Sequence, residues 1–193
     1  MRKISFAVVL LMILLCLASC TRSAERITDH RAVPIQKAID GVIDCDTAKY
    51  RSAFADDYDK AVSASYELTE GMTFDAFLKD VVLLPAKDAH KDNLGKTYGI
   101  EFIVENVDEY TVFDVPQEYV DYFIDYSDYS VYDYELDISA IQKVAVISGK
   151  LNKWGYDSFW DEEKDETGSA KFITICVGDV WYLHPCYYFT VFN

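Results

Sequence analysis

Hydrophobic positions near the start of the chain's folded part repeat at helical spacing. Apolar residues recur at steps of four, three and three through Ile35, Ile39, Val42 and Cys45. This is one face of a 3.6-residue repeat. Pro34 suits the first turn of such a helix, because its missing N–H has no partner there. We expect the apolar face to continue through Phe54 and Tyr58, so the pattern predicts a long N-terminal helix.

A second, shorter helix is predicted after Gly71. Thr73 can cap it, and helical spacing follows at Phe74, Phe77, Leu78 and Val81. Pro85 is expected to end the helix, because proline lacks the N–H that a helix interior needs. The next stretch, 87–96 (KDAHKDNLGK), is expected to be a charged loop.

From residue 98 the hydrophobic period changes to two. The apolar residues Ile100, Phe102 and Val104 are separated by Glu101, Ile103 and Glu105. This alternation predicts a strand over 98–112 with one face largely buried. A second alternation begins at Ser130 and predicts a long strand that continues to Leu151.

Residues 117–129, between these two alternations, show helical spacing. One face carries the rings of Tyr119, Phe123 and Tyr126. Another face carries the carboxylates of Asp121, Asp125 and Asp128. We expect an amphipathic helix whose aromatic side lies in the core and whose acidic side is solvated.

The end of the chain predicts a hairpin. Residues 171–177 (KFITICV) form a strand, Gly178-Asp179 a two-residue turn, and 180–183 (VWYL) the returning strand. This register makes Cys176 and Trp181 cross-strand neighbours. Before the hairpin, 161–169 (DEEKDETGS) is expected to be an acidic, turn-prone connection, and 186–192 is a candidate for a last short strand.

This order of elements resembles the nuclear transport factor 2-like fold, which many small bacterial lipoproteins share. The resemblance includes the closing Lys-bearing strand, Gly-centred turn and Trp-Tyr-Leu strand at 171–183. It implies an α+β fold, in which a curved antiparallel sheet wraps a long N-terminal helix to form a cone. We expect one such domain over 33–193. Enzymes of the family place an Asp, His or Tyr inside the cone, but no residue here can be matched to such a set.

The first twenty residues have the pattern of a secretion signal. Met1-Arg2-Lys3 is basic, residues 4–17 are almost wholly apolar, and Leu17-Ala18-Ser19-Cys20 follows. The last four residues resemble the lipobox of bacterial lipoproteins, whose cysteine receives a diacylglycerol and becomes the N-terminus. We therefore expect a signal peptide at 1–19 and a lipidated tether at 20–32, with lipidation at Cys20. The alternative is an ordinary secretory signal.

The net negative charge of the chain limits which partners it can bind. The formal net charge is −15, and cleavage of the signal would remove Arg2 and Lys3 and leave −15 − 2 = −17. Such a chain repels the phosphates of nucleic acids and anionic lipids, so no nucleic acid is expected as a partner. The expected location is extracytoplasmic, where the lipid on Cys20 anchors the protein to the bacterial membrane. Aromatic content of 15% and hydrophobic content of 51% favour a well-packed core.

No residue pattern specifies catalysis, a cofactor or a metal. After processing, the remaining thiols belong to Cys45, Cys176 and Cys186, none at zinc-ligand spacing, and we expect no disulfide between the last two. None of the three histidines lies in a motif that supplies both the acid and the nucleophile that a general base would work with, although His30 follows Asp29. The acidic stretch 161–166 lacks the residue order of a calcium-binding loop.

The strongest binding candidates are the rings of Trp154, Tyr156 and Trp160, with 161–166 as a polar rim. Extended chain would place these three rings on one side, although they could instead fill the concave sheet face. We therefore expect a non-catalytic surface lipoprotein that binds a protein, peptide or glycan. Two alternatives stay open: a small envelope enzyme with an acid/base pair inside the cone, and an accessory or sensory subunit of an envelope transport system.

Overall fold

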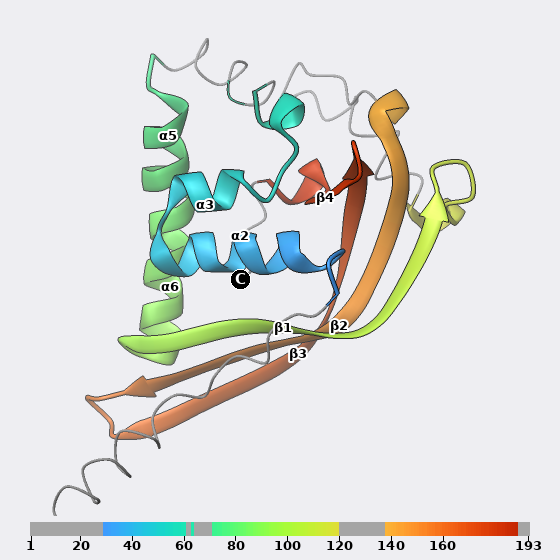
Figure 1. Ribbon diagram of the computed structural model, residues 1–193. Coiled ribbons are helices and arrows are strands. Elements are labelled where there is room, and N and C mark those ends of the chain that lie inside the picture. The colour runs from blue at the N-terminus through green and yellow to red at the C-terminus, as the bar shows by residue number, and fades with distance from the viewer. Residues whose placement is uncertain (1–28, 61–62, 64–70, 120–137, 189–193) are drawn as a thin grey trace, which may run out of the picture.

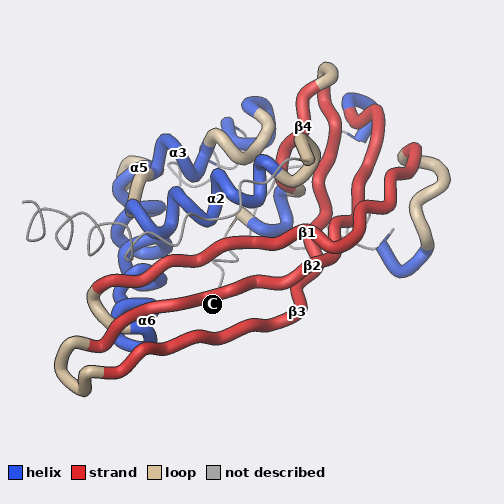
Figure 2. Tube along the Cα trace, turned by 60° about the horizontal axis from the view of Figure 1, so that its bottom comes forward, coloured by secondary structure: helices blue, strands red, loops and turns tan. Residues whose placement is uncertain are grey.

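Helices lie on one face of a four-stranded antiparallel sheet, so the fold is α+β (Figures 1 and 2). The computed structural model describes residues 29–60, 63, 71–119 and 138–188. The predicted signal peptide, Cys20 and most of the predicted tether lie outside these residues. So do the rest of the predicted 117–129 helix after Tyr119 and the start of the strand predicted from Ser130.

The strand order is β1-β2-β3-β4, with every neighbouring pair antiparallel. The strands are β1 (Thr97–Thr111), β2 (Ile141–Asp157), β3 (Glu162–Val177) and β4 (Val180–Leu183). The helices are α2 (Val33–Asp44), α3 (Thr47–Arg51), α5 (Phe74–Phe77) and α6 (Leu84–Leu94), with a π-helical segment (Leu78–Leu83) between the last two. Short 3-10 helices cover Ile138–Ala140 and Pro185–Tyr187.

Helix α2 starts where the sequence predicts and ends earlier. Pro34 lies in its first turn, and Ile35, Ile39 and Val42 are buried. Cys45 adopts a left-handed conformation that closes the helix, and Asp46 caps the separate helix α3. The predicted continuation of one helix through residues 54 and 58 is therefore wrong.

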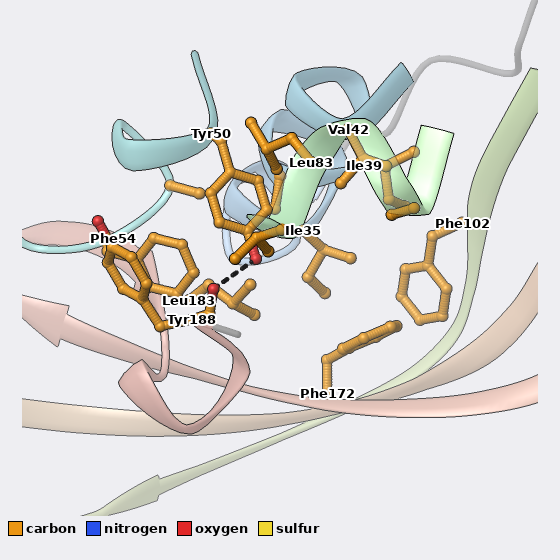
Figure 3. Close-up of a cluster of buried hydrophobic side chains, with 14 of the residues drawn as sticks. Ile35, Ile39, Val42, Tyr50, Phe54, Leu83, Phe102, Phe172, Leu183 and Tyr188 are labelled. Atoms are coloured by element: carbon orange, nitrogen blue, oxygen red, sulfur yellow. Dashed lines mark hydrogen bonds between the residues drawn. The ribbon is translucent and has the colours of Figure 1, made fainter. Parts of the chain in front are cut away.

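The core lies between α2 and the sheet. Ile35, Ile39 and Val42 belong to the same buried cluster as Phe102 and Phe172 from the sheet (Figure 3). The two phenylalanine rings meet edge to face, with centroids 4.9 Å apart. A second buried cluster surrounds Val144, Ile173 and Ile175. By strand alternation, these side chains point to the opposite face of the sheet from Phe172 and its cross-strand partner Ile147.

The long strands bend as they pass beneath α2 (Figure 1). The β1–β2 register shifts between Val104 and Asn106, and a bulge of this kind increases the local twist. Gly149 lies opposite Val104, where an added Cβ would be 2.0 Å from the carbonyl oxygen of Ile103. Only glycine allows the two strands to come this close at the bend.

Two segments differ from their predicted structure. Residues 87–94 belong to α6 and not to a loop, because the π-to-α junction accommodates Pro85 in the first turn of α6. Its buried residues, Ala86, His90 and Leu94, recur at steps of four. Residues 162–169 belong to β3, where backbone pairing with β2 holds a strand whose side chains are mostly exposed.

The strand over 98–112 and the closing hairpin are confirmed. Gly178 and Asp179 have φ values of 58° and 64°, as the two central residues of a type I′ turn require. Cys176 lies opposite Trp181. The candidate last strand begins instead with the 3-10 helix at Pro185–Tyr187, and residues 189–193 lie outside the described part of the chain.

Candidate functional site

The β2–β3 hairpin carries all three candidate aromatic residues at its end. Its turn at 158–161 lies at the lower left of Figure 1, beyond the end of α6. The Asp157 carboxylate accepts the backbone N–H of Phe159 at 2.9 Å, and Asp161 adopts a left-handed φ of 54°. These features form a tight turn, which carries Phe159 and Trp160 just beyond Tyr156 at the end of β2.

Trp154 lies on the sheet face that points away from the helices. Its neighbour Gly155 faces α6, since a Cβ there would lie 2.8 Å from the Cβ of Leu94, and successive strand residues point to opposite faces. The Trp154 indole lies over its cross-strand partner Gly99, where an added Cβ would be 2.3 Å from Cζ2. Trp154 is thus half-buried against the sheet surface, outside the core.

Tyr156 shares this outer face and is more exposed, at 40%. Its hydroxyl donates a hydrogen bond to the Asp161 carboxylate across the turn. This bond, together with partial burial and the nearby carboxylates of Glu163 and Asp157, raises the pKa of Tyr156. The phenol therefore stays protonated and fixed as a hydrogen-bond donor.

Phe159 and Trp160 form the tip. Their side chains are 81% and 71% exposed, and their rings meet edge to face with centroids 4.8 Å apart. Trp160 is one of the three candidate residues from the sequence, and Phe159 is not. The turn brings the two rings together, which extended geometry could not predict.

The side chain of Lys164 links the hairpin to helix α6. Lys164 donates to the backbone carbonyl of Asn93 near the end of α6 at 2.7 Å. Its Nζ also lies 3.6 Å from the Asp157 carboxylate. The pKa of Asp157 is lowered, first by the backbone N–H of Phe159 and further by the N–H of Trp160 and by Lys164. The base of the turn is therefore held in place while its tip projects into solvent.

The histidines do not form an accessible acid/base site. His90 is buried on α6 beside Tyr98, with ring centroids 5.8 Å apart. His184 is fully buried, and its Nδ1 accepts the backbone N–H of Cys186. Burial lowers the pKa of His184 to about 3, so its imidazole is neutral at physiological pH. His30 is exposed, with its Nδ1 3.9 Å from the Asp29 carboxylate.

The most extensive polar cluster joins the C-terminal segment to α3. Arg51 donates to both carboxylate oxygens of Asp59, at 2.7–3.1 Å, and to Asp75 at 2.6 Å. The Tyr188 hydroxyl donates to Asp59. Tyr50 donates to the carbonyl oxygen of Tyr188 at 2.9 Å, drawn as the dashed line in Figure 3. Arg51 holds the carboxylate as an ion pair, so this cluster serves as a structural clamp.

The part of the chain that the structure describes offers few groups for binding a metal ion, for thiol chemistry or for catalysis in a cavity. There, no group of three or more His, Cys, Asp or Glu is arranged to hold a metal ion. Cys45, Cys176 and Cys186 are not joined in a disulfide. A hollow of about 350 Å³ at the far end of the sheet has no titratable lining: its walls are Thr111, Val112, Phe113, Ser139, Ile141 and Gln142.

Comparisons with protein-family models, with curated proteins and with solved structures find no match to this chain. Among the described residues, no helix is both long enough and apolar enough to span a membrane. Function must therefore be inferred from the chain's own residues. Among the described residues, four large aromatic side chains are exposed, and three of them, Tyr156, Phe159 and Trp160, lie at the end of the β2–β3 hairpin.

Proposed function

We propose that this protein is a bacterial surface lipoprotein whose domain binds a protein partner through the end of its β2–β3 hairpin. A diacylglycerol on Cys20 would anchor it on the extracytoplasmic side of the membrane. The observation that carries the binding role is the pair of rings at the tip, Phe159 and Trp160, at 81% and 71% exposure. Large aromatic side chains supply much of the binding energy of protein interfaces, because they bury a large area and lose little entropy.

The surroundings of the tip support this role. Trp154 and Tyr156 extend the aromatic surface along the outer face of the hairpin. The turn is fixed by the bonds of Asp157 and Asp161, so the rings are pre-organised and less entropy is lost on binding. Hydrophobic rings held rigidly in water are typical of a contact surface that a partner covers.

The proposed fold is the nuclear transport factor 2-like cone. The order of helices and strands, the bent sheet with α2 on its inner side, and the closing hairpin at 171–183 support it. In this arrangement the helices fill the inner side of the sheet. The free end of the hairpin, which extends past α6, then offers the aromatic contact surface.

Site-specific photo-crosslinking in intact cells tests the binding role. A photoreactive amino acid in place of Phe159 should give a discrete protein adduct that disappears when Trp160→Ala is added. Phe113 provides the matched control, since it is 98% exposed at the opposite end of β1 and should give no such adduct. Equal adducts from both positions, or a Phe159 adduct that survives Trp160→Ala, would show that the tip is not a specific contact.

A further inference from the structure

The partner's chemistry can be inferred from the register of the hairpin. We propose that the partner presents a basic segment, and that its lysine or arginine side chains bind between aromatic rings and carboxylates on the outer face of the hairpin. This rests on the proposed function and adds the class of ligand. The surface is the aromatic–acidic face, defined by Trp154, Tyr156, Glu163 and Asp165 together with the tip residue Trp160.

Strand pairing places rings and carboxylates side by side on this face. Trp154 lies opposite Asp165, and Tyr156 lies opposite Glu163. Directly opposite residues share a face, with Cβ atoms about 5 Å apart. A cationic side chain that reaches this face can therefore lie over a ring, within about 6 Å of its centroid, and contact a carboxylate at the same time. The two interactions together favour ammonium and guanidinium groups over neutral ones.

The end of the hairpin contains more acidic than basic residues. Residues 154–170 contain six acidic residues and one basic residue, a net charge of 1 − 6 = −5. The one basic residue, Lys164, points to the opposite face, toward Asn93 and Asp157. No ion pair within the described residues joins Glu163 or Glu166 to a basic side chain. A cationic partner would supply the missing charge.

Charge also favours a basic segment over other ligands that could bind an aromatic surface. Phosphate-bearing ligands and anionic bilayers would be repelled by the carboxylates. A neutral bilayer or an uncharged sugar could contact the rings, but it would gain nothing from the acidic side chains. A basic protein segment therefore matches the aromatic–acidic face best. Comparing its binding with that of neutral ligands tests this proposal directly.

The test measures binding of a lysine-rich decapeptide to the full mature chain in detergent micelles by calorimetry. Saturable binding is expected, and it should weaken as NaCl rises from about 50 mM to about 300 mM. The double variant Glu163→Gln/Asp165→Asn should bind about tenfold more weakly, a loss of about 1.4 kcal/mol. Glu163→Gln alone should give a smaller loss in the same direction, and Trp160→Ala should also weaken binding.

The control variant removes the same charge elsewhere. Asp56→Asn/Asp57→Asn changes two exposed carboxylates on a different element and should leave the affinity within about twofold. Equal losses in both double variants would overturn the proposal, because long-range charge alone would then explain binding. So would absence of peptide binding, or equally tight binding of phosphatidylcholine vesicles or a neutral oligosaccharide. If the Phe159 crosslink persists in those cases, the binding role stands and only the assigned chemistry fails.

Discussion

At the scale of single residues, the two tryptophans of the hairpin differ in what surrounds them. Trp160 is 71% exposed, whereas Trp154 is half-buried over Gly99. Trp160→Ala should therefore change the melting temperature by less than about 2 °C. Trp154→Ala should lower the free energy of unfolding by about 1–3 kcal/mol, because the contact with the sheet is lost. Thermal and urea unfolding of the two variants measures the difference.

Large and equal decreases in melting temperature and free energy of unfolding in both tryptophan variants would contradict this assignment. They would mean that Trp160 also contributes to folding, and the tip could not be treated as a free contact surface. The wild-type chain and Phe113→Ala serve as references, because Phe113 is an exposed ring at the other end of β1.

His184 should make the stability depend on pH. Its pKa is about 3 in the fold and about 6.5 in the unfolded chain, so the unfolded chain binds more protons between these values. Stability is thus unaffected by this group above pH ~6.5 and falls as the pH drops below it, by about 1.4 kcal/mol per pH unit. Urea unfolding at pH 7 and at about pH 5.5, where most carboxylates are still ionised, measures this slope.

Replacement of His184 should remove most of the slope. In His184→Asn the new side chain can still accept the N–H of Cys186. The substitution alters packing and so shifts the stability at pH 7, whereas the difference in stability between the two pH values should shrink. The exposed His30 provides the control, because His30→Asn should leave the slope unchanged. An unchanged slope in His184→Asn would assign the titration to other groups.

At the scale of elements, the bend of the sheet depends on Gly149. An added Cβ would lie 2.0 Å from the Ile103 carbonyl oxygen and 2.9 Å from Cζ of Phe102. The first contact is with backbone, so the strands would have to move apart. Gly149→Ala should lower the free energy of unfolding by about 2–4 kcal/mol, by the same mechanism as overpacking of a core.

The matched control for this substitution lies on β3. Gly168 has no atom within 4 Å of an added Cβ, and its φ is not in the left-handed region. Gly168→Ala should therefore be neutral or slightly stabilising, because it restricts only the unfolded chain. Chemical denaturation compares the two variants. Similar stabilities would show that the strands can separate at the bend without cost.

At the scale of the whole molecule, attachment to the membrane depends on Cys20. Cys20→Ala should leave a precursor that retains residues 1–19 and carries no lipid, because the thiol is the group that receives the diacylglycerol. Mass spectrometry of the N-terminus measures both features. Cys16→Ala is the control, since Cys16 lies within the apolar stretch of the signal and should not be needed for processing. Wild-type protein that begins with an unmodified Cys20 would contradict the anchor.

The sequence alone determined the features that depend on neighbours along the chain. Gly178-Asp179 predicted its turn, because a type I′ turn needs two residues that tolerate positive φ. The alternation from Ile100 predicted β1, because Ile100 and Phe102 lie on one face of the strand and are buried there. Glu101, on the other face, is buried as well, which the alternation did not predict. Pro34 likewise marked the start of α2.

Only the tertiary structure decided features that depend on contacts between distant segments. Residues 162–169 form a strand because they pair with β2. The alternation of apolar and polar residues that predicts a strand is absent from this segment. Residues 87–94 are helical as part of α6, whose residues Ala86, His90 and Leu94 recur at steps of four and are buried. The exposure of Trp160 was equally undecided, since a large ring fits a core or a surface and only the fold determines what covers it.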